Sequence, residues 1–181
     1  MEIRALREDD QRSGFHSGND YLDRFFRQFA GQNQFRHHLG VTYVAAQATR
    51  ILGYATVSPG HLEVDGLPAV ARKKFPHYPI PVLRLARLAV EESAQGQGLG
   101  RQLLRFVLQL SLDMDAKFGC AGVVVDAKPE AMDFYRTFGF ITLDAIEGLS
   151  DARPRPQAMF LAIRAIGEAA MFADMHPRRS R

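Results

Sequence analysis

A glycine-rich loop at residues 95–100 is the part of this sequence whose residue types most directly indicate chemistry. It follows an apolar, strand-like segment and precedes an amphipathic helix. Glycines leave backbone N–H groups uncovered, and a helix N-terminus offers unpaired N–H groups and the positive end of its dipole. The arrangement therefore predicts a site for a phosphate-bearing ligand. The loop reads Gln95-Gly96-Gln97-Gly98-Leu99-Gly100.

Two common glycine-rich motifs do not fit this loop. A dinucleotide fingerprint, G-x-G-x-x-G, would need its third glycine where Arg101 stands, and a P-loop would need a lysine after the glycines. The pattern that fits is Q-x-x-G-x-G, with Gln95, Gly98 and Gly100 placed after the strand end 88–90. It resembles the pyrophosphate loop of the GNAT superfamily of acetyl-CoA-dependent N-acetyltransferases. The alternative is a loop that caps a helix without any ligand.

The resemblance implies acetyl-CoA as cosubstrate and no metal ion. Leu88 and Val90 share one strand face, so their backbone amides are expected to meet the pantetheine arm and the thioester carbonyl. The residues expected to bind acetyl-CoA are Leu88, Ala89, Val90, Gln95, Gly96, Gln97, Gly98, Leu99, Gly100, Arg101 and Gln102.

A second motif lies at residues 134–140 and matches the superfamily pattern F-Y-x-x-x-G-F. By that resemblance, Tyr135 lies near the sulfur of coenzyme A and is the expected catalytic residue. A phenol hydroxyl there can hydrogen-bond or protonate the departing thiolate. The alternative is that Tyr135 only packs its ring on an amphipathic helix, as Phe134 and Phe138 would.

The strand at residues 82–90 carries two arginines and no carboxylate. Arg84 and Arg87 alternate onto opposite faces, so only one is expected to reach a substrate cleft, where it would attract an anionic substrate. The alternative is an arginine whose stem covers apolar surface. The superfamily often places a general base on or near this strand, but Glu91 and Glu92 follow it and are expected to cap the loop. Acceptor deprotonation is therefore expected to pass through water.

The periodicity of apolar residues predicts the elements that position these motifs. Five prolines in residues 58–81 indicate mostly connection, and Gly139 is expected to end the helix before it. Strands are expected at 3–6, 41–46, 51–57, 82–90, 123–125, from 140 and at 159–163, and helices at 21–29, near 69–75, at 99–114 and at 130–138. This pattern indicates an α/β (α+β) fold with a central mixed, mostly antiparallel, splayed sheet flanked by helices. Residues 1–163 are expected to form one N-acetyltransferase domain, and residues 164–181 a loosely docked helix or a disordered tail.

The composition is that of an ordinary globular protein, with 181 residues, 46% hydrophobic and 24% charged, and a net charge of +3. One cysteine, Cys120, excludes an internal disulfide. No apolar stretch is long enough for a membrane span and the N-terminus lacks a signal-peptide core, so a cytoplasmic location is expected.

The order of motifs up to Ile163 looks like that of the acetyltransferase toxins of bacterial toxin–antitoxin pairs, which acetylate the free α-amine of aminoacyl-tRNA. The most specific details are the cluster 32–34, Gln-Asn-Gln, and the pair Arg84 and Arg87. The resemblance implies aminoacyl-tRNA as acceptor, a cognate DNA-binding antitoxin as partner, and a homodimer as one assembly.

Two alternatives stay open on the sequence alone. One is an N-acetyltransferase for a small amine or a peptide amine. The other is a non-catalytic module that binds coenzyme A or a partner. The net charge is modest for a protein that binds nucleic acid. The basic residues that would form a tRNA surface, or otherwise a solvated face, are Arg24, Arg27, Arg36, His37, His38, Arg72, Lys73 and Lys74.

Overall fold

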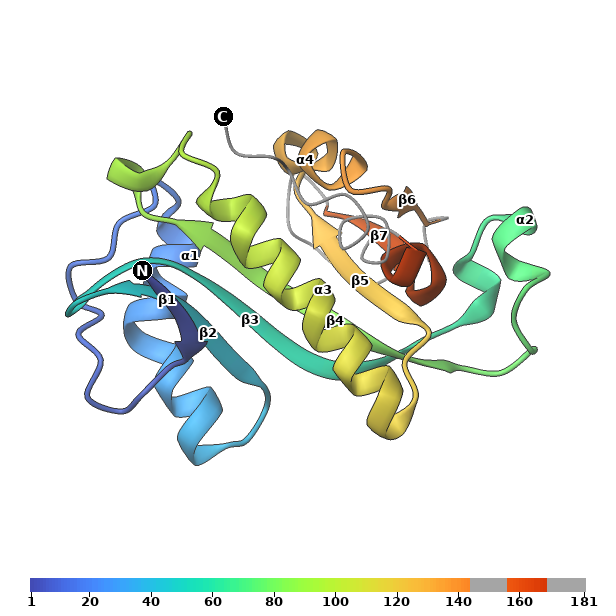
Figure 1. The fold of residues 1–181 in the computed structure, drawn as a ribbon, viewed down its shortest axis with the longest axis horizontal. Coiled ribbons are helices and arrows are strands. Elements are labelled where there is room, and N and C mark those ends of the chain that lie inside the picture. Colours follow the sequence, from blue (N-terminus) through green and yellow to red (C-terminus); the bar gives the residue numbers. More distant parts are fainter. Residues whose placement is uncertain (144–155, 169–181) are drawn as a thin grey trace. The chain divides into compact units, whose positions relative to one another are not determined.

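Seven strands form one mixed, mostly antiparallel sheet in the computed structural model, which describes residues 1–143 and 156–168 (Figure 1). The strands are β1 (Glu2–Ala5), β2 (Val41–Gln47), β3 (Arg50–Leu62), β4 (Ile80–Val90), β5 (Gly122–Ala127), β6 (Ile141–Thr142) and β7 (Gln157–Ala162). Their hydrogen-bonded order is β1-β2-β3-β4-β5-β7-β6. The fold class expected from the sequence is confirmed.

The chain forms two compact units. The first comprises Met1–Pro59 and Leu85–Gln109, and the second comprises Gly60–Arg84 and Leu110–Arg181. The helices are α1 (Asp20–Arg24), α2 (Ala69–Arg72), α3 (Leu99–Phe118) and α4 (Met132–Arg136). Strands β3 and β4 and helix α3 have residues in both units.

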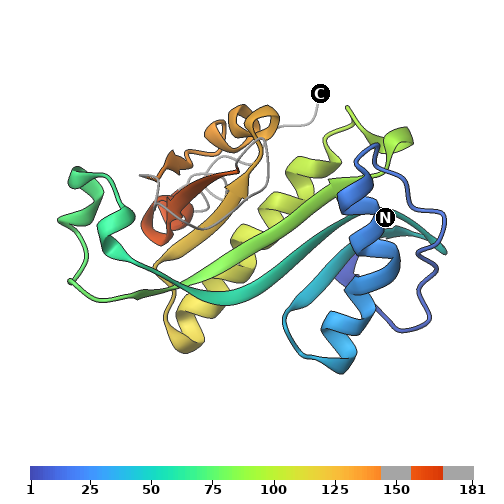
Figure 2. The same cartoon turned by 180° about the vertical axis from the view of Figure 1, so that it is seen from behind.

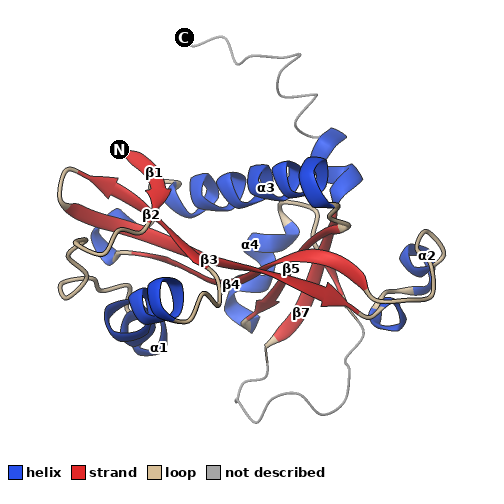
Figure 3. Ribbon diagram, turned by 90° about the horizontal axis from the view of Figure 1, so that it is seen from below, coloured by secondary structure: helices blue, strands red, loops and turns tan. Residues whose placement is uncertain are grey.

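In the first unit, helices cover both faces of the antiparallel strands β1, β2 and β3. Figure 3 shows α1 on one face of these strands and the first half of α3 on the other. The Phe26 ring stacks on Tyr54 of β3 with centroids 4.4 Å apart, and the Tyr54 hydroxyl donates to the carbonyl oxygen of Leu22 at 2.9 Å. These contacts fix α1 against the sheet.

The absence of a side chain at Gly53 of β3 lets α3 approach the sheet closely. A Cβ at this position would lie 2.9 Å from a methyl group of Leu103 and 3.0 Å from the carbonyl oxygen of Ala89. Leu103 is fully buried. Close packing at Gly53 therefore sets where the N-terminal half of α3 lies in the first unit.

The helical run that begins at α1 continues to Arg36, beyond the expected end at Phe29. Asn19 caps it, with its side-chain oxygen accepting from the N–H of Leu22 at 3.2 Å. Two π-helical turns, η1 (Phe25–Phe29) and η2 (Gln32–Arg36), follow, and Figure 2 shows the run in blue beside the strands of its unit. The side chain of Gln34 fastens the end of the run, because it donates to the carbonyl oxygen of Leu6 and accepts from the N–H of Thr42.

The second unit has its own core around strands β5 and β7, which pair antiparallel, with β6 pairing to β7. Val124 of β5, in the strand expected at 123–125, is buried together with Phe160 of β7 and Val82 of β4. Gly139 has φ 89° and follows α4, which confirms the expected C-terminal glycine.

The ends of two further elements, β3 and α3, differ clearly from the sequence-based expectations. Strand β3 extends to Leu62 through Pro59, where a connection was expected. Proline has a φ compatible with an extended strand and lacks only the N–H donor, so Pro59 did not end the strand. The short helix near residues 69–75 is confirmed as α2, and α3 runs about one turn beyond its expected end, to Phe118, before Gly119 at φ 86°.

The boundary expected at residue 163 between a domain and a tail stays a prediction. Residues 163–168 are helical, and residues 169–181 lie outside the described part of the chain. Within the described residues, no helix combines the length and apolar character needed to span a membrane.

A fully buried carboxylate, Asp23 of α1, connects the helix to the segment before it. Its oxygens accept from the N–H and hydroxyl of Ser17, at 2.9 and 2.6 Å, and lie 2.9 Å from Nδ1 of His16. Burial favours the neutral acid, but the hydrogen bonds from Ser17 and His16 outweigh it and hold the pKa of Asp23 below its ordinary value.

Replacing Asp23 with Ala is expected to lower the free energy of unfolding by about 1–3 kcal/mol at neutral pH, because Ser17 loses a buried acceptor. The folded pKa lies below the unfolded one, about 3.9, so the ionised carboxylate stabilises the fold above that pH. The contribution is lost as the pH falls through the folded pKa. Urea unfolding at several pH values should therefore show a gap between parent and variant that narrows in acid. A gap independent of pH would contradict the assignment.

Candidate functional site

The glycine-rich loop leads from β4 into α3 through a short 3₁₀ turn, η4 (Glu92–Ala94). Gly96 has φ 73° and Gly98 has φ 82°, a backbone region that favours glycine. A Cβ built at either position meets no atom within 4 Å. The glycines are therefore needed for the backbone path, and the space beside them is open.

Gly98 is the residue before the first turn of α3, because the N–H of Gln102 donates to its carbonyl oxygen at 3.1 Å. The first N–H groups of any α-helix have no acceptor within that helix. In a helix of 20 residues these groups add to the full dipole. The loop and the start of α3 together provide the chemistry of an anion site.

Two glutamine side chains of the loop hydrogen-bond to backbone carbonyl oxygens of neighbouring segments. The Gln95 amide donates to the carbonyl oxygens of Ser17, at 2.9 Å, and Val90, at 3.0 Å. The Gln97 amide donates to the carbonyl oxygen of Ser93 at 2.9 Å. The glutamine of the Q-x-x-G-x-G pattern thus has a structural role here, because Gln95 fastens the loop to β4 and to the segment before α1.

Glu91 caps the turn at the loop entrance, as expected. Its carboxylate accepts from the N–H and hydroxyl of Ser93 and pairs with Arg50 at 2.9 Å. The bond from the Ser93 hydroxyl and, despite partial burial, the charge of Arg50 hold the pKa of Glu91 below its ordinary value. An ionised, fully engaged carboxylate is a poor proton acceptor, so Glu91 fits the capping role. Glu92 lies 3.7 Å from Nε2 of His16.

The end of β4 has the alternation that the sequence predicts. The Ala89 side chain is buried, whereas Leu88 and Val90 are half-buried and pack against a cluster that includes Leu99 and Leu103 of α3. Leu88 and Val90 therefore lie on one strand face, beside the helix that begins at the loop.

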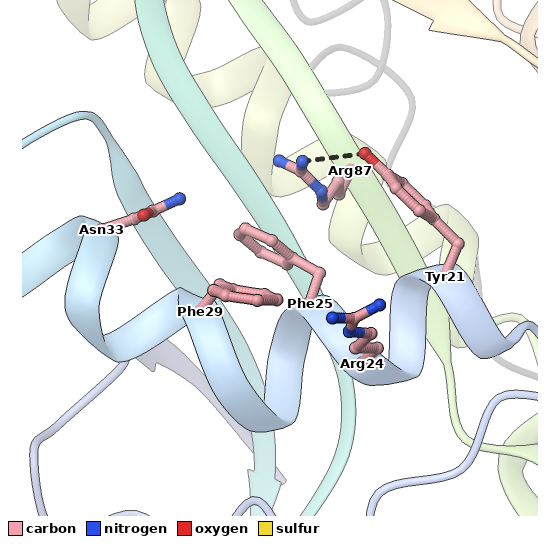
Figure 4. A pocket seen from close by; sticks show the side chains of 6 residues that line it. All are labelled: Tyr21, Arg24, Phe25, Phe29, Asn33 and Arg87. Carbon is pink, nitrogen blue, oxygen red and sulfur yellow. Dashed lines mark hydrogen bonds between the residues drawn. The ribbon is translucent and has the colours of Figure 1, made fainter. Parts of the chain in front are cut away.

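A cavity of about 310 Å³ opens beside β4 in the first unit, and we call it the aromatic pocket (Figure 4). Arg87 of β4 lies over the Phe25 ring, with Cζ 3.7 Å from the centroid. Its Nη2 donates to the Tyr21 hydroxyl at 3.1 Å. The pocket is lined by Tyr21, Arg24, Phe25, Phe29, Asn33 and Arg87.

A smaller cavity of about 160 Å³ shares Asn33 and Arg87 with the aromatic pocket, and we call it the hydroxyl pocket. The buried hydroxyl groups of Thr42 and Thr56 lie 2.9 Å apart in it. Its lining residues are Ala30, Asn33, Leu39, Gly40, Thr42, Thr56, Ser58, Ala86 and Arg87. Sequence reasoning missed this cavity and the aromatic walls of its neighbour, because the aromatic residues of 21–29 have the periodicity of a core stripe.

Of the two arginines expected on opposite faces of the strand, Arg87 lines both described cavities and Arg84 lines neither. Arg84 pairs instead with the carboxylate of Asp126 on β5, in the second unit. Partial neutralisation by Asp126 makes Arg84 the weaker candidate for an anionic substrate.

Tyr135 lies on α4 in the second unit, with its ring edge-on to Phe134 and Phe140 at centroid distances of 5.2 and 5.5 Å. The side chain is 6% exposed. Burial raises the pKa of Tyr135 well above its ordinary value, so the hydroxyl stays protonated at neutral pH and is able to donate. Within the described residues, no group of three or more His, Cys, Asp or Glu side chains is placed to hold a metal ion.

Residues 38–142 match the Acetyltransferase (GNAT) domain family. A tRNA-acetylating toxin of Mycobacterium tuberculosis is 31% identical over 140 residues, which are 76% of this chain and 82% of the toxin.

Solved structures of similar fold include AtaT complexed with acetyl-methionyl-tRNAfMet, at 26% identity and a TM-score of 0.79, covering 93% of this chain and 98% of that one. AtaTR bound with AcCoA has 26% identity and a TM-score of 0.74, covering 93% and 97%. The glycine-rich loop after β4, the tyrosine of α4 and these similarities lead to one conclusion: the chain belongs to the GNAT family of acetyltransferases.

Proposed function

We propose that this enzyme transfers the acetyl group of acetyl-CoA to the α-amine of an aminoacyl-tRNA. The observation that carries the proposal is the combination, in one compact unit, of an open glycine-rich loop at a helix N-terminus and a cationic, aromatic pocket beside the same strand. The similarity to a tRNA-acetylating toxin over 76% of the chain supports the acceptor class. A small amine would need neither a pocket of this size nor two arginines in its lining.

In the proposed complex, the backbone N–H groups of the loop and of the first turn of α3 hold the pyrophosphate. The amides of β4 hold the pantetheine arm and the thioester carbonyl. The cofactor residues are Leu88, Ala89, Val90, Gln95, Gly96, Gln97, Gly98, Leu99, Gly100, Arg101 and Gln102. The solved complex of AtaTR with AcCoA supports acetyl-CoA as the cosubstrate.

The proposed chemistry is direct transfer. The neutral amine nitrogen attacks the thioester carbonyl carbon, and the C–N bond forms as the carbonyl oxygen becomes an oxyanion. Collapse of this intermediate breaks the C–S bond, the nitrogen loses a proton to water, and the thiolate takes a proton. We assign that last donation to Tyr135, whose hydroxyl carries a proton at neutral pH and can hydrogen-bond the sulfur as its negative charge develops.

The similarity to a tRNA-acetylating toxin also supports a biological role as a toxin. We propose that the enzyme blocks translation in the cytoplasm and that a cognate DNA-binding antitoxin restrains it. Growth arrest on expression, relieved by the Tyr135→Phe substitution, is the expected behaviour of such a toxin.

The salt dependence of the two Michaelis constants tests the acceptor. Phosphate contacts release counterions, so the KM for charged tRNA should rise steeply with salt while the KM for acetyl-CoA changes much less. Lys73 and Lys74 are exposed beside α2, and Lys73→Glu with Lys74→Glu should weaken tRNA binding without affecting acetyl-CoA. Equal, shallow slopes together with no acetylation of charged tRNA would reject the proposal in favour of a small amine.

A further inference from the structure

We propose that the aromatic pocket binds the unpaired 3′-terminal nucleotide of the acceptor RNA, with the base stacked on its aromatic wall and a phosphate at Arg24. The inference rests on the proposed function, since it names the part of the acceptor that this pocket takes. It is carried by the charge of the pocket, by its exposed rings and by its neighbouring cavity.

The charge of the pocket selects an anion. Two of its six lining residues are arginines and none of the six is acidic. The Arg24 guanidinium lies over the Phe29 ring at 5.8 Å, and the Arg87 guanidinium lies over Phe25 at 3.7 Å. A protonated α-amine would be repelled here, and an aliphatic side chain would gain nothing from the guanidinium groups. A phosphate group is attracted to both.

Two of the three aromatic rings that line the pocket are exposed to solvent. Tyr21 is 61% exposed and Phe29 is 39% exposed, whereas Phe25 and Phe26 of the same helical run are buried in the core. Two partly exposed aromatic rings at the edge of a cationic cavity are the usual platform for an unpaired base. The cavity volume of about 310 Å³ leaves room for a base with its ribose.

The hydroxyl pocket suits the group that the nucleotide carries. It is half the size and its polar side chains, apart from Arg87, are uncharged, with Thr42 and Thr56 buried. It adjoins the aromatic pocket through Asn33 and Arg87. An aminoacyl ester is bonded to the terminal ribose, so a nucleotide in the aromatic pocket places its aminoacyl group at the shared wall.

Arg87 offers a further reason for a ligand with acceptor oxygens. Its Nε is buried and has no hydrogen-bond partner among the described residues, although Nη2 binds the Tyr21 hydroxyl. A buried donor without an acceptor is unfavourable. A guanidinium has five N–H donors, and ribose hydroxyl and phosphate oxygens can accept from those of Arg87 that face the pocket.

Phe29→Leu tests the stacking, because leucine retains an apolar side chain and removes the ring. The KM for charged tRNA should rise about tenfold, and the KM for acetyl-CoA should not change. The factor should be the same for a tRNA charged with glycine and one charged with a large amino acid, since both end in the same nucleotide. Phe118→Leu, at an exposed ring outside both pockets, is the matched control. An unchanged KM, or a factor that follows the amino acid, would overturn the proposal in favour of a side-chain pocket.

Arg24→Gln tests the phosphate. The slope of log KM for charged tRNA against log salt should decrease by about one, whereas Phe29→Leu should leave that slope unchanged. Arg105→Gln removes the same charge from an exposed position on α3 and should leave the slope as it is. An unaltered slope in Arg24→Gln would contradict the assignment of a phosphate contact to Arg24.

A competition experiment on the unmodified protein needs no variant to fold. The trinucleotide CCA should inhibit acetylation of charged tRNA more strongly than the same trinucleotide with an abasic terminal ribose. Equal inhibition would reject the stacked base. Failure of the proposed function is distinguishable, because the parent enzyme would then acetylate no charged tRNA in any of these assays.

Discussion

Replacing Tyr135 with Phe should reduce turnover about 100-fold or more, the usual contribution of a positioned general acid. The substitution removes one hydroxyl and keeps the ring, so the edge-on contacts with Phe134 and Phe140 persist. The variant should therefore fold like the parent and bind acetyl-CoA with the same affinity. Single-turnover transfer to charged tRNA, with calorimetric binding of acetyl-CoA beside it, separates the two effects.

Tyr43→Phe is the control for this experiment. Burial also raises the pKa of Tyr43, but its ring lies against Phe106 of α3, at 4.9 Å, and has no assigned part in the reaction. Turnover should be unchanged in this variant. If Tyr135→Phe transfers acetyl groups as fast as the parent, then Tyr135 only packs its ring, and the thiolate takes its proton from solvent.

Replacing Gly98 with Val should weaken acetyl-CoA binding about tenfold to a hundredfold. A Cβ at Gly98 meets no protein atom within 4 Å, so the side chain would fill the space that the pyrophosphate needs. The backbone N–H groups would then lose charge-assisted hydrogen bonds, each contributing about 1.5–3 kcal/mol. Calorimetry with acetyl-CoA measures the change directly.

Gly119→Val separates ligand exclusion from backbone strain. Gly119 follows the other end of α3, with φ 86° against 82° at Gly98, and a Cβ there also meets nothing within 4 Å. Both valines therefore carry a similar backbone penalty, and both should lower thermal stability. Only Gly98→Val should lower acetyl-CoA affinity. Unchanged acetyl-CoA affinity in Gly98→Val would contradict the assignment of the pyrophosphate to this loop.

The parts of the fold that depend on local patterns were predictable from the sequence. The strand at Val123–Val125 and the glycine at 139 each depend on neighbours in the chain, and each is confirmed. The predicted end of the first helical run, at residue 29, was wrong because the last turn of the run has no apolar stripe. That turn is fastened by Gln34, which binds Leu6 and Thr42 through contacts distant in sequence.

The features of the candidate site also separate into those that local sequence patterns predict and those that depend on distant contacts. The position of the loop was predictable, since φ values of 73° and 82° require glycine. The aromatic pocket was not, because Tyr21 and Phe29 share the helical spacing of the buried Phe25 and Phe26. Spacing alone does not say which rings of a helix face solvent. The pairing of Arg84 with Asp126, 42 residues away, was likewise invisible to local patterns.

The two faces of helix α1 differ in how amino-acid substitutions there would affect the cofactor loop. Its inward side chain Asp23 holds Ser17, whose carbonyl oxygen in turn holds Gln95 of the loop. Its outward side chains Tyr21 and Arg24 line the aromatic pocket. Mutations that retune acceptor preference therefore have a route through the outward face, which leaves the cofactor loop intact. A designer seeking a new acceptor would randomise that face first and keep the inward one.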